Sequence, residues 1–393
     1  MIIRRLREDE NKKLNAIQSL AFSFPYDRDE EKEGGLHSEV YGAFLDDGET
    51  LTATIFTPEF QSCYNGSVLP AVGIGGVASL PEYRRMGSIR AIFDHIFSLA
   101  PERGWAASYL YPFSFQFYRQ FGYERVIRRH GLKLPANVLE KFGRNTGAKL
   151  YERDGSVKKE ELLSVYNAWA VKNNITFARG ENTWAWSDKP HASQRFTYLW
   201  YAGDGTPAAL ATFSCKDGCM RVKELCYLSA DALRGMLGFL RMFEGQVWEY
   251  DFTELPEDCE LDYLLSRYID AEYHEENGAM GRVLLPGVLL EKNRYPKEHG
   301  HFRLKIDDFL DFSRGVWEVE YEHGAAEVKK LPFDAACDVV MTAPPMTRLL
   351  LGSVTLDCER AVFLDGVTIE NRAGAEDLFR AFPRRPAVLY ERF

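Results

Sequence analysis

The chain has 393 residues, with 48 Lys and Arg against 58 Asp and Glu, which gives a formal net charge of −10 at pH 7. Its 46% hydrophobic and 27% charged residues exclude a disordered chain, and its length predicts two to three domains. The negative charge argues against nucleic acid as a partner, because affinity for a phosphate backbone comes mostly from Lys and Arg.

Cysteine content and hydropathy predict the cellular compartment. Seven cysteines, an odd number, argue against a disulfide framework. The first fourteen residues are too charged for a signal peptide, and no run of about 18 apolar residues occurs. We therefore expect a reduced, soluble, cytoplasmic protein with no membrane partner.

Three sections follow one another along the chain, and we predict domains at residues 1–148, 149–288 and 289–393. The second section contains a helix-like run at 162–174 and strand-like runs at 195–203, 207–215 and 220–228. The third contains a hairpin signal at 316–331, where apolar and polar residues alternate. In each of the first two sections a strand leads through a short loop into a helix, which predicts two copies of one fold.

The segment 71–100 is the most informative for function. Small apolar residues at 71–78 predict a strand that another molecule can approach closely. An apolar stripe with helical spacing then predicts an amphipathic helix, with Ile89, Ile92, Phe93, Ile96 and Phe97 on one face.

Arg84, Arg85, Gly87 and Ser88 lie where this helix is expected to begin. The first helical turn has N–H groups without intrahelical partners and a partial positive charge. A glycine lets a phosphate come close, and arginines add charge-assisted hydrogen bonds. The pattern favours a cofactor with a diphosphate. The alternative is a surface loop with two solvated arginines before an ordinary helix, since the motif is short.

The run VASLPEYRRMGSI at 77–89 resembles the acetyl-CoA-binding motif of GNAT acetyltransferases, Arg/Gln-x-x-Gly-x-Gly/Ala. Arg84 and Gly87 match this motif, whereas Ile89 occupies its last position. A bulky aliphatic residue there is usual in GNAT proteins of the enhanced intracellular survival (Eis) type. The chain also resembles this group in FYRQFGY at 117–123, in length, in its three sections and in its C-terminal ERF.

The resemblance implies an α+β protein with two tandem GNAT-like domains followed by an α/β domain similar to sterol carrier protein. Residues 338–356 carry the likeness to the last domain. The second section lacks an Arg-x-x-Gly loop after 220–228, so we expect its copy to bind no cofactor. The resemblance also implies a homo-oligomer, a hexamer, and an acetyl-CoA-dependent N-acetyltransferase.

Acetyl transfer to an amine requires a cradle for the thioester carbonyl and a proton for the departing thiolate. By resemblance the backbone N–H groups of Val77 and Ser79, with Ala78 between them, form the cradle. Arg84, Arg85, Gly87 and Ser88 hold the pyrophosphate. Tyr118 donates the proton, since a phenol with a pKa of about 10 is protonated at neutral pH. The alternative is that Tyr118 only packs in an aromatic cluster.

The resemblance assigns the base to the terminal carboxylate of Phe393. The run AVLY before ERF is typical of a buried strand, and an apolar last residue argues against the frayed end that most domains have. With an ordinary pKa of about 3.3–3.7, this carboxylate would act by its position or through water.

The acceptor is expected to be a small cationic primary amine, of the aminoglycoside, polyamine or lysine kind. Phe24 and Tyr26 are candidates for cation–π contacts with it, and Asp27 for a charge contact, although a solvated loop fits this stretch equally well. Trp184 and Trp186 are comparable candidates.

We expect no metal site. Cys215, Cys219 and Cys226 have loose spacing and no nearby histidine, and His299 and His301 read as surface residues. Two other functions stay open: an acyltransferase for a longer acyl-CoA, similar to protein N-myristoyltransferases, and a carrier of hydrophobic ligands that uses the third section.

Overall fold

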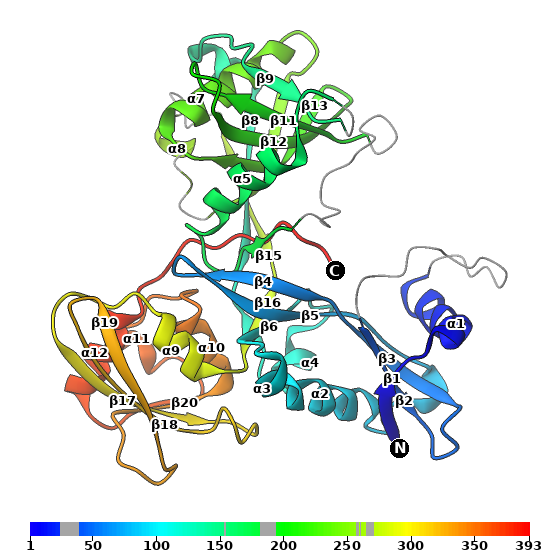
Figure 1. Ribbon diagram of the computed structural model, residues 1–393, viewed down its shortest axis with the longest axis vertical. Helices are drawn as coiled ribbons and strands as arrows, with labels where there is room; N and C mark the ends of the chain where they lie inside the picture. The colour runs from blue at the N-terminus through cyan, green and yellow to red at the C-terminus, as the bar shows by residue number, and fades with distance from the viewer. Residues whose placement is uncertain (24–38, 153–154, 181–193, 257–258, 260, 265–270) are drawn as a thin grey trace.

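A computed structural model shows three β-sheets with helices packed around them (Figure 1). It describes residues 1–23, 39–152, 155–180, 194–256, 259, 261–264 and 271–393. The class is α+β, as predicted. In Figure 1 the second sheet lies at the top, the third at the lower left and the first to its right. Among the described residues, no helix has the length and apolar character needed to cross a membrane.

The first sheet has nine strands in the order β1-β2-β3-β5-β6-β16-β7, with β4 beside β5 and β10 beside β4. The strands are β1 Ile2–Arg5, β2 Glu39–Phe44, β3 Leu51–Thr57, β4 Glu59–Tyr64, β5 Ser67–Ser79, β6 Ala107–Leu110, β7 Glu124–Arg125, β10 Phe177–Ala178 and β16 Met280–Val283. Its helices are α1 Asn11–Phe22, α2 Ser88–Ser98, α3 Ala100–Arg103 and α4 Phe115–Arg119. The strand and helix predicted within 71–100 are β5 and α2, and the predicted apolar stripe of α2 packs into the core with β2 and β3.

The second sheet has the order β15-β8-β14-β13-β12-β11-β9. Its strands are β8 Arg128–Pro135, β9 Ala148–Leu150, β11 Phe196–Tyr201, β12 Pro207–Lys216, β13 Cys219–Tyr227, β14 Glu249–Leu255 and β15 Glu272–Asn277, and its helices are α5 Lys159–Ala170, α7 Ala230–Leu240 and α8 Leu261–Leu264. Strands β13 and β14 are parallel and are joined through α7, just as β5 and β6 are parallel and joined through α2. The two copies of one strand–helix–strand unit predicted from the sequence are therefore present.

Three strands cross the domain boundary that the sequence predicts at 148/149. Strand β8 precedes residue 148 but pairs in the second sheet, whereas β10 and β16 follow residue 149 and pair in the first. The boundary at 148/149 therefore does not separate the first two sheets, whereas all described strands of the third sheet follow residue 289. A local sequence pattern indicates that a strand forms. Which strand it pairs with depends on contacts between residues that are distant in the sequence.

The third sheet has the order β19-β18-β17-β20-β21, and β17 runs parallel to β20. Its strands are β17 Gly300–Asp307, β18 Gly315–Glu322, β19 Ala325–Leu331, β20 Val339–Thr342 and β21 Val367–Ile369. The helices around it are α9 Pro286–Lys292, α10 Ala343–Leu350, α11 Cys358–Ala361 and α12 Arg372–Ala381. The predicted hairpin at 316–331 is confirmed as β18 and β19, with residues 322 and 325 as the last pair before the turn.

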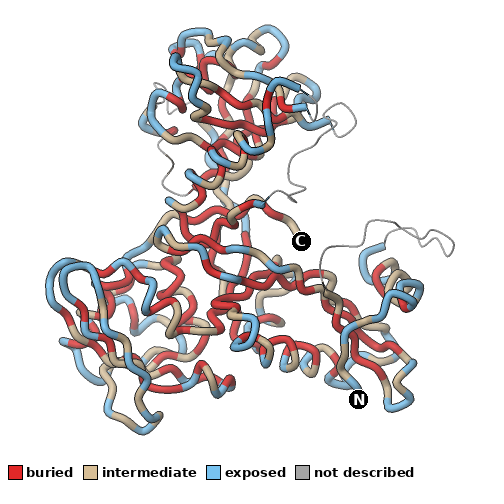
Figure 2. Tube along the Cα trace, viewed as in Figure 1, coloured by how far each residue is buried: buried red, intermediate tan, exposed pale blue. Residues whose placement is uncertain are grey.

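The C-terminal tail, residues 386–393, leaves the third domain and runs between the first and second sheets (Figures 1 and 2). Residues 387–389 are buried, and the last two residues are half-buried. The backbone N–H of Asn174 donates to the carbonyl of Pro386 at 2.8 Å, and the Thr176 hydroxyl donates to the carbonyl of Val388 at 2.7 Å. The end of the chain is thus packed, as the apolar AVLY run predicts, but it forms only an isolated bridge at Ala387 and not the strand that the run indicated.

Candidate active site

Strands β5 and β6 separate in the middle of the first sheet. Their parallel pairing runs from Ala71 and Ala107 to Ile74 and Leu110, after which β5 continues to Ser79 beside β3. The N–H of Leu80 donates to the Thr52 carbonyl at 3.0 Å. Because N–H directions alternate along a strand, those of Val77 and Ser79 point toward the opposite edge, where β6 has diverged.

These are the two amides to which the sequence assigns the carbonyl cradle. Ala78 lies between them, with its side chain buried and its N–H directed toward β3 by the same alternation. An edge of a central strand with N–H groups that face a gap is suited to bind a polarised carbonyl oxygen.

The loop before α2 is open to solvent. Gly87 caps the helix with φ +83°, and a Cβ atom at this position would meet nothing within 4 Å. The side chains of Arg84 and Arg85 are exposed, and neither makes an ion pair or hydrogen bond with another described residue. Ser88 is buried, with its Oγ 3.1 Å from the Thr52 Oγ1, so only its backbone N–H faces the helix end. The geometry fits a diphosphate at this helix end, with two arginines available to it.

Tyr118 lies on α4, whose N-cap Ser114 accepts a hydrogen bond from the Phe117 N–H at 3.3 Å. Its side chain is 3% exposed and packs edge-on against Phe93 of α2 and against Phe113. Burial raises the pKa of its hydroxyl well above the usual value, so this group keeps its proton at neutral pH. No hydrogen bond joins the hydroxyl to another residue in the described part of the chain.

The end of the chain lies on β5 at the place where β6 diverges. The Phe393 ring packs against Phe60 with the ring centroids 4.8 Å apart, and against Tyr111 with the centroids 5.7 Å apart. A Cβ atom at position 73 would lie 2.7 Å from this ring, and one at position 75 would lie 3.1 Å from the terminal carboxyl carbon. A Cβ at position 73 would therefore clash with the ring, and one at position 75 would press on the carboxyl group. The carboxylate therefore lies over the first residue after the last β5–β6 pair.

A buried ionic cluster of Arg179, Glu224 and Glu391 holds the tail in place. Arg179 donates to Glu391 at 2.7 Å and to both oxygens of Glu224 at 2.7 and 3.2 Å. Its side chain is 2% exposed, and its guanidinium stacks on the Tyr166 ring at 3.8 Å. The tail is thus tied to β13 of the second sheet two residues before its carboxylate.

Sequence reasoning missed this cluster. The available signal was charge inside runs with apolar neighbours: Arg179 in ITFARG at 175–180, and three charged residues in MRVKELCYL at 220–228. Buried charges of this kind need a partner, but the sequence does not say which residue supplies it.

Comparison with known families agrees with this architecture. Residues 2–126 and 176–283 each match a family model described as an acetyltransferase (GNAT) domain, and residues 287–390 match a sterol carrier protein domain. The chain is a GNAT-superfamily protein with the Eis-type fold. No curated protein sequence matches it.

Solved structures share this Eis-type fold over their whole length. A conserved protein of unknown function from Enterococcus faecalis V583, a probable N-acyltransferase, is 24% identical over 100% of this chain and 99% of its own, with a TM-score of 0.84. Eis1 from Mycobacterium abscessus is 15% identical over 100% of both chains, with a TM-score of 0.80. A GCN5-related N-acetyltransferase from Kribbella flavida is 19% identical over 100% and 98%, with a TM-score of 0.78. The GNAT domains place the protein in the acyltransferase class.

In this Eis-type fold the second GNAT domain has its own strand separation, which the tail fills. The parallel pairing of β13 and β14 ends at Val222 and Phe252, and three residues later the Leu225 N–H donates to the Tyr390 hydroxyl at 3.4 Å. The Tyr390 ring stacks on Trp169 with the centroids 5.5 Å apart. One side chain of the tail therefore contacts the second separation, and its carboxylate reaches the first.

Phe24, Tyr26 and Asp27, like Trp184 and Trp186, lie outside the described residues. The described residues contain no group of three or more His, Cys, Asp or Glu that could hold a metal ion. His299 and His301 pair on the surface of the third domain with Glu320 and Glu318, at 3.3 and 3.2 Å.

Proposed function

We propose that the protein is an acetyl-CoA-dependent N-acetyltransferase that modifies a primary amine, of the aminoglycoside, polyamine or lysine side-chain kind. The observation that carries this proposal is the terminal carboxylate of Phe393 over Gly75, at the gap between β5 and β6. Amine acylation needs a base at this place, and the buried ionic cluster holds the carboxylate there.

In the proposed reaction, residues of the gap, of the loop before α2 and of α4 each have a role. Arg84, Arg85 and the N–H groups at the start of α2 bind the pyrophosphate, and the amides of Val77 and Ser79 polarise the thioester carbonyl. The amine nitrogen forms its bond to the carbonyl carbon as the carbon–sulfur bond breaks. The amine proton passes to the Phe393 carboxylate, directly or through water, and the thiolate takes the proton of Tyr118. Release of the amine proton from the Phe393 carboxyl group to solvent and return of a proton to Tyr118 complete the cycle, and the products are an amide and CoA.

The first experiment measures CoA release with a panel of amines, together with calorimetry of acetyl-CoA binding. We expect binding of acetyl-CoA and transfer to at least one amine, with propionyl- and longer acyl-CoA as slower donors. Absence of acetyl-CoA binding contradicts the proposal, and a preference for a long chain favours the alternative acyltransferase. We also propose, from the Eis-type fold, a cytoplasmic homohexamer, for which light scattering gives the mass in solution.

Replacing Arg84 and Arg85 together by Ala is expected to weaken acetyl-CoA binding by roughly a hundredfold. A hydrogen bond to a charged group contributes about 1.5–3 kcal/mol, and each guanidinium is free to make one. Arg90→Ala, in the first turn of α2, is a control, because this arginine already bonds Gln120 at 3.0 Å. Unchanged binding in the double variant favours the carrier of hydrophobic ligands.

Gly75→Val is expected to reduce turnover by about a hundredfold, because the new side chain displaces the carboxyl group and a shift of about 1 Å is sufficient for this loss. Steady-state kinetics with saturating acetyl-CoA measures the effect. The control is Gly203→Val, because this glycine is exposed and a Cβ there meets nothing within 4 Å. Normal turnover in Gly75→Val means that the carboxylate position is irrelevant.

A further inference from the structure

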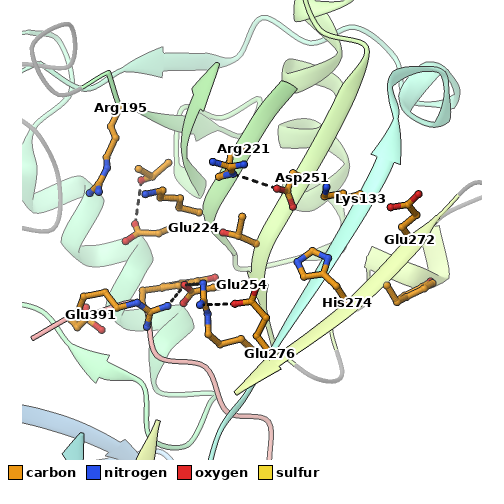
Figure 3. A pocket seen from close by; sticks show the side chains of 17 residues that line it. Lys133, Arg195, Arg221, Glu224, Asp251, Glu254, Glu272, His274, Glu276 and Glu391 are labelled. Carbon is orange, nitrogen blue, oxygen red and sulfur yellow. Dashed lines mark hydrogen bonds and ion pairs between the residues drawn. The ribbon is translucent and has the colours of Figure 1, made fainter. Parts of the chain in front are cut away.

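A cavity of about 780 Å³ lies on one face of the second sheet, beside the tail (Figure 3). Strands β8, β12, β13, β14 and β15 contribute side chains to it, and Tyr390, Glu391 and Arg392 border it. Because one extended residue spans about 3.3–3.6 Å, the terminal carboxylate is one residue beyond this border. A molecule in the cavity that follows the tail reaches the carboxylate.

Charged residues of both signs line the sheet face in this cavity. Arg221, Asp251, Lys133 and Glu272 are successive partners across β13, β14, β8 and β15, so their side chains share one face. Arg221 pairs with Asp251 at 3.3 Å (Figure 3). Neighbouring side chains of opposite charge on this face neutralise one another. The residues that could bind a charged ligand are therefore those without such a partner.

The acidic side chains near the tail already have cationic partners. Glu224 and Glu391 bind Arg179, which lies behind the wall of the cavity. Glu254 is bound by Arg129 at 3.0 Å and also by Arg392. The carboxylates closest to the tail are therefore poor sites for a cationic substrate.

Two lysines of the cavity lack such partners. Lys223 is half-buried and occupies a β-bulge, because Phe213 pairs with Val222 whereas Thr212 pairs with Glu224. Its amino group makes no hydrogen bond or ion pair with another described residue, and the same holds for half-buried Lys133. Burial lowers the pKa of Lys223, and the charges of Arg195 and Arg221 lower it further. Lys223 is therefore a cation of the cavity without an ion-pair partner among the described residues, and Lys133 is a second one, with Glu272 as its cross-strand neighbour.

We propose that the acceptor amine carries an anionic group, a carboxylate or a phosphate, and that this cavity binds that group through Lys223 and Lys133. The inference rests on the proposed N-acetyltransferase function and replaces a purely cationic acceptor by a zwitterionic one. The amine then lies along Arg392 toward the terminal carboxylate, with the anionic end among the lysines of β13 and β8.

The test compares acceptors that differ only in the anion. Nα-acetyllysine and Nα-acetyllysinamide have the same primary amine, and only the first carries a carboxylate; O-phosphoethanolamine and ethanolamine form the matching phosphate pair. We expect kcat/KM to be at least about tenfold higher for the anionic member of one pair, and that pair distinguishes carboxylate from phosphate. Lys223→Gln is expected to abolish this preference by raising the acceptor KM, with kcat and the acetyl-CoA KM unchanged.

Lys216→Gln is the matched control, because Lys216 is an exposed lysine at the end of β12 outside the cavity. Equal kcat/KM values for the two members of both pairs overturn the inference. A change of the acetyl-CoA KM in Lys223→Gln also overturns it, because the lysine would then contact CoA and not the acceptor. Calorimetry of the same pairs separates the two proposals. Anion-dependent binding without transfer to any amine contradicts the N-acetyltransferase function and leaves the anion site supported.

Discussion

A chain extended by two residues after Phe393 is expected to lose turnover by about 10²–10⁴-fold, the usual contribution of a general base, while its affinity for acetyl-CoA is unchanged. The Phe393 carboxyl carbon lies over Gly75, where a single added Cβ atom would approach it to 3.1 Å. Extra residues move the carboxylate away from the gap and replace it by a neutral amide. Steady-state CoA release and calorimetry measure the two quantities separately.

The matched control is a two-residue extension at the N-terminus. Met1 is exposed, and its strand β1 lies at the far edge of the first sheet from β6. We expect full activity from this variant. Full activity from the C-terminal extension would remove the carboxylate from the mechanism, and loss of acetyl-CoA affinity would mean that the tail serves binding.

Arg179→Met is expected to destabilise the protein by about 3–5 kcal/mol, because it leaves Glu224 and Glu391 buried without a cation. The same change releases the tail from the second sheet, so turnover falls even where the variant stays folded. Chemical denaturation gives the stability, and kinetics in the folded range of denaturant gives the turnover.

A second variant separates charge from position. Adding Glu224→Gln and Glu391→Gln to Arg179→Met removes the uncompensated charges, so we expect most of the stability to return while turnover stays low. Arg234→Met is the control, because Arg234 pairs with Asp231 at an exposed site and such pairs contribute about 0–1 kcal/mol. Normal turnover in Arg179→Met would mean that the other contacts of the tail, such as those of Thr176 and Glu254, are sufficient to hold it.

Much of the fold follows from local pattern. The strand and helix within 71–100, the hairpin at 316–331 and the repeat of one strand–helix–strand unit are all present, because periodicity decides such elements over a few residues. The exchange of β8, β10 and β16 between sheets was not predictable, since a strand's pattern does not specify its partner.

The candidate site was predictable to a similar extent. Arg84, Gly87, Tyr118 and Phe393 were named from motifs, and the structure places Gly87 at the start of α2 and Phe393 on β5. The cluster around Arg179 and the cavity lysine Lys223 were missed, because each acquires its role from residues more than 40 positions away or from a bulge in the sheet.

By itself the sequence determined the elements, the class and the family, because apolar period and short motifs are local properties of the chain. Its charge of −10 argued against nucleic acid as a partner, since net charge is a sum over the whole chain. Only the tertiary structure decided where the chain ends in space and which charges lack a partner. Whether two charged side chains form an ion pair depends on a few ångströms between residues that are distant in the sequence. In this acidic protein, the folded arrangement gives two lysines of the cavity no ion-pair partner among the described residues.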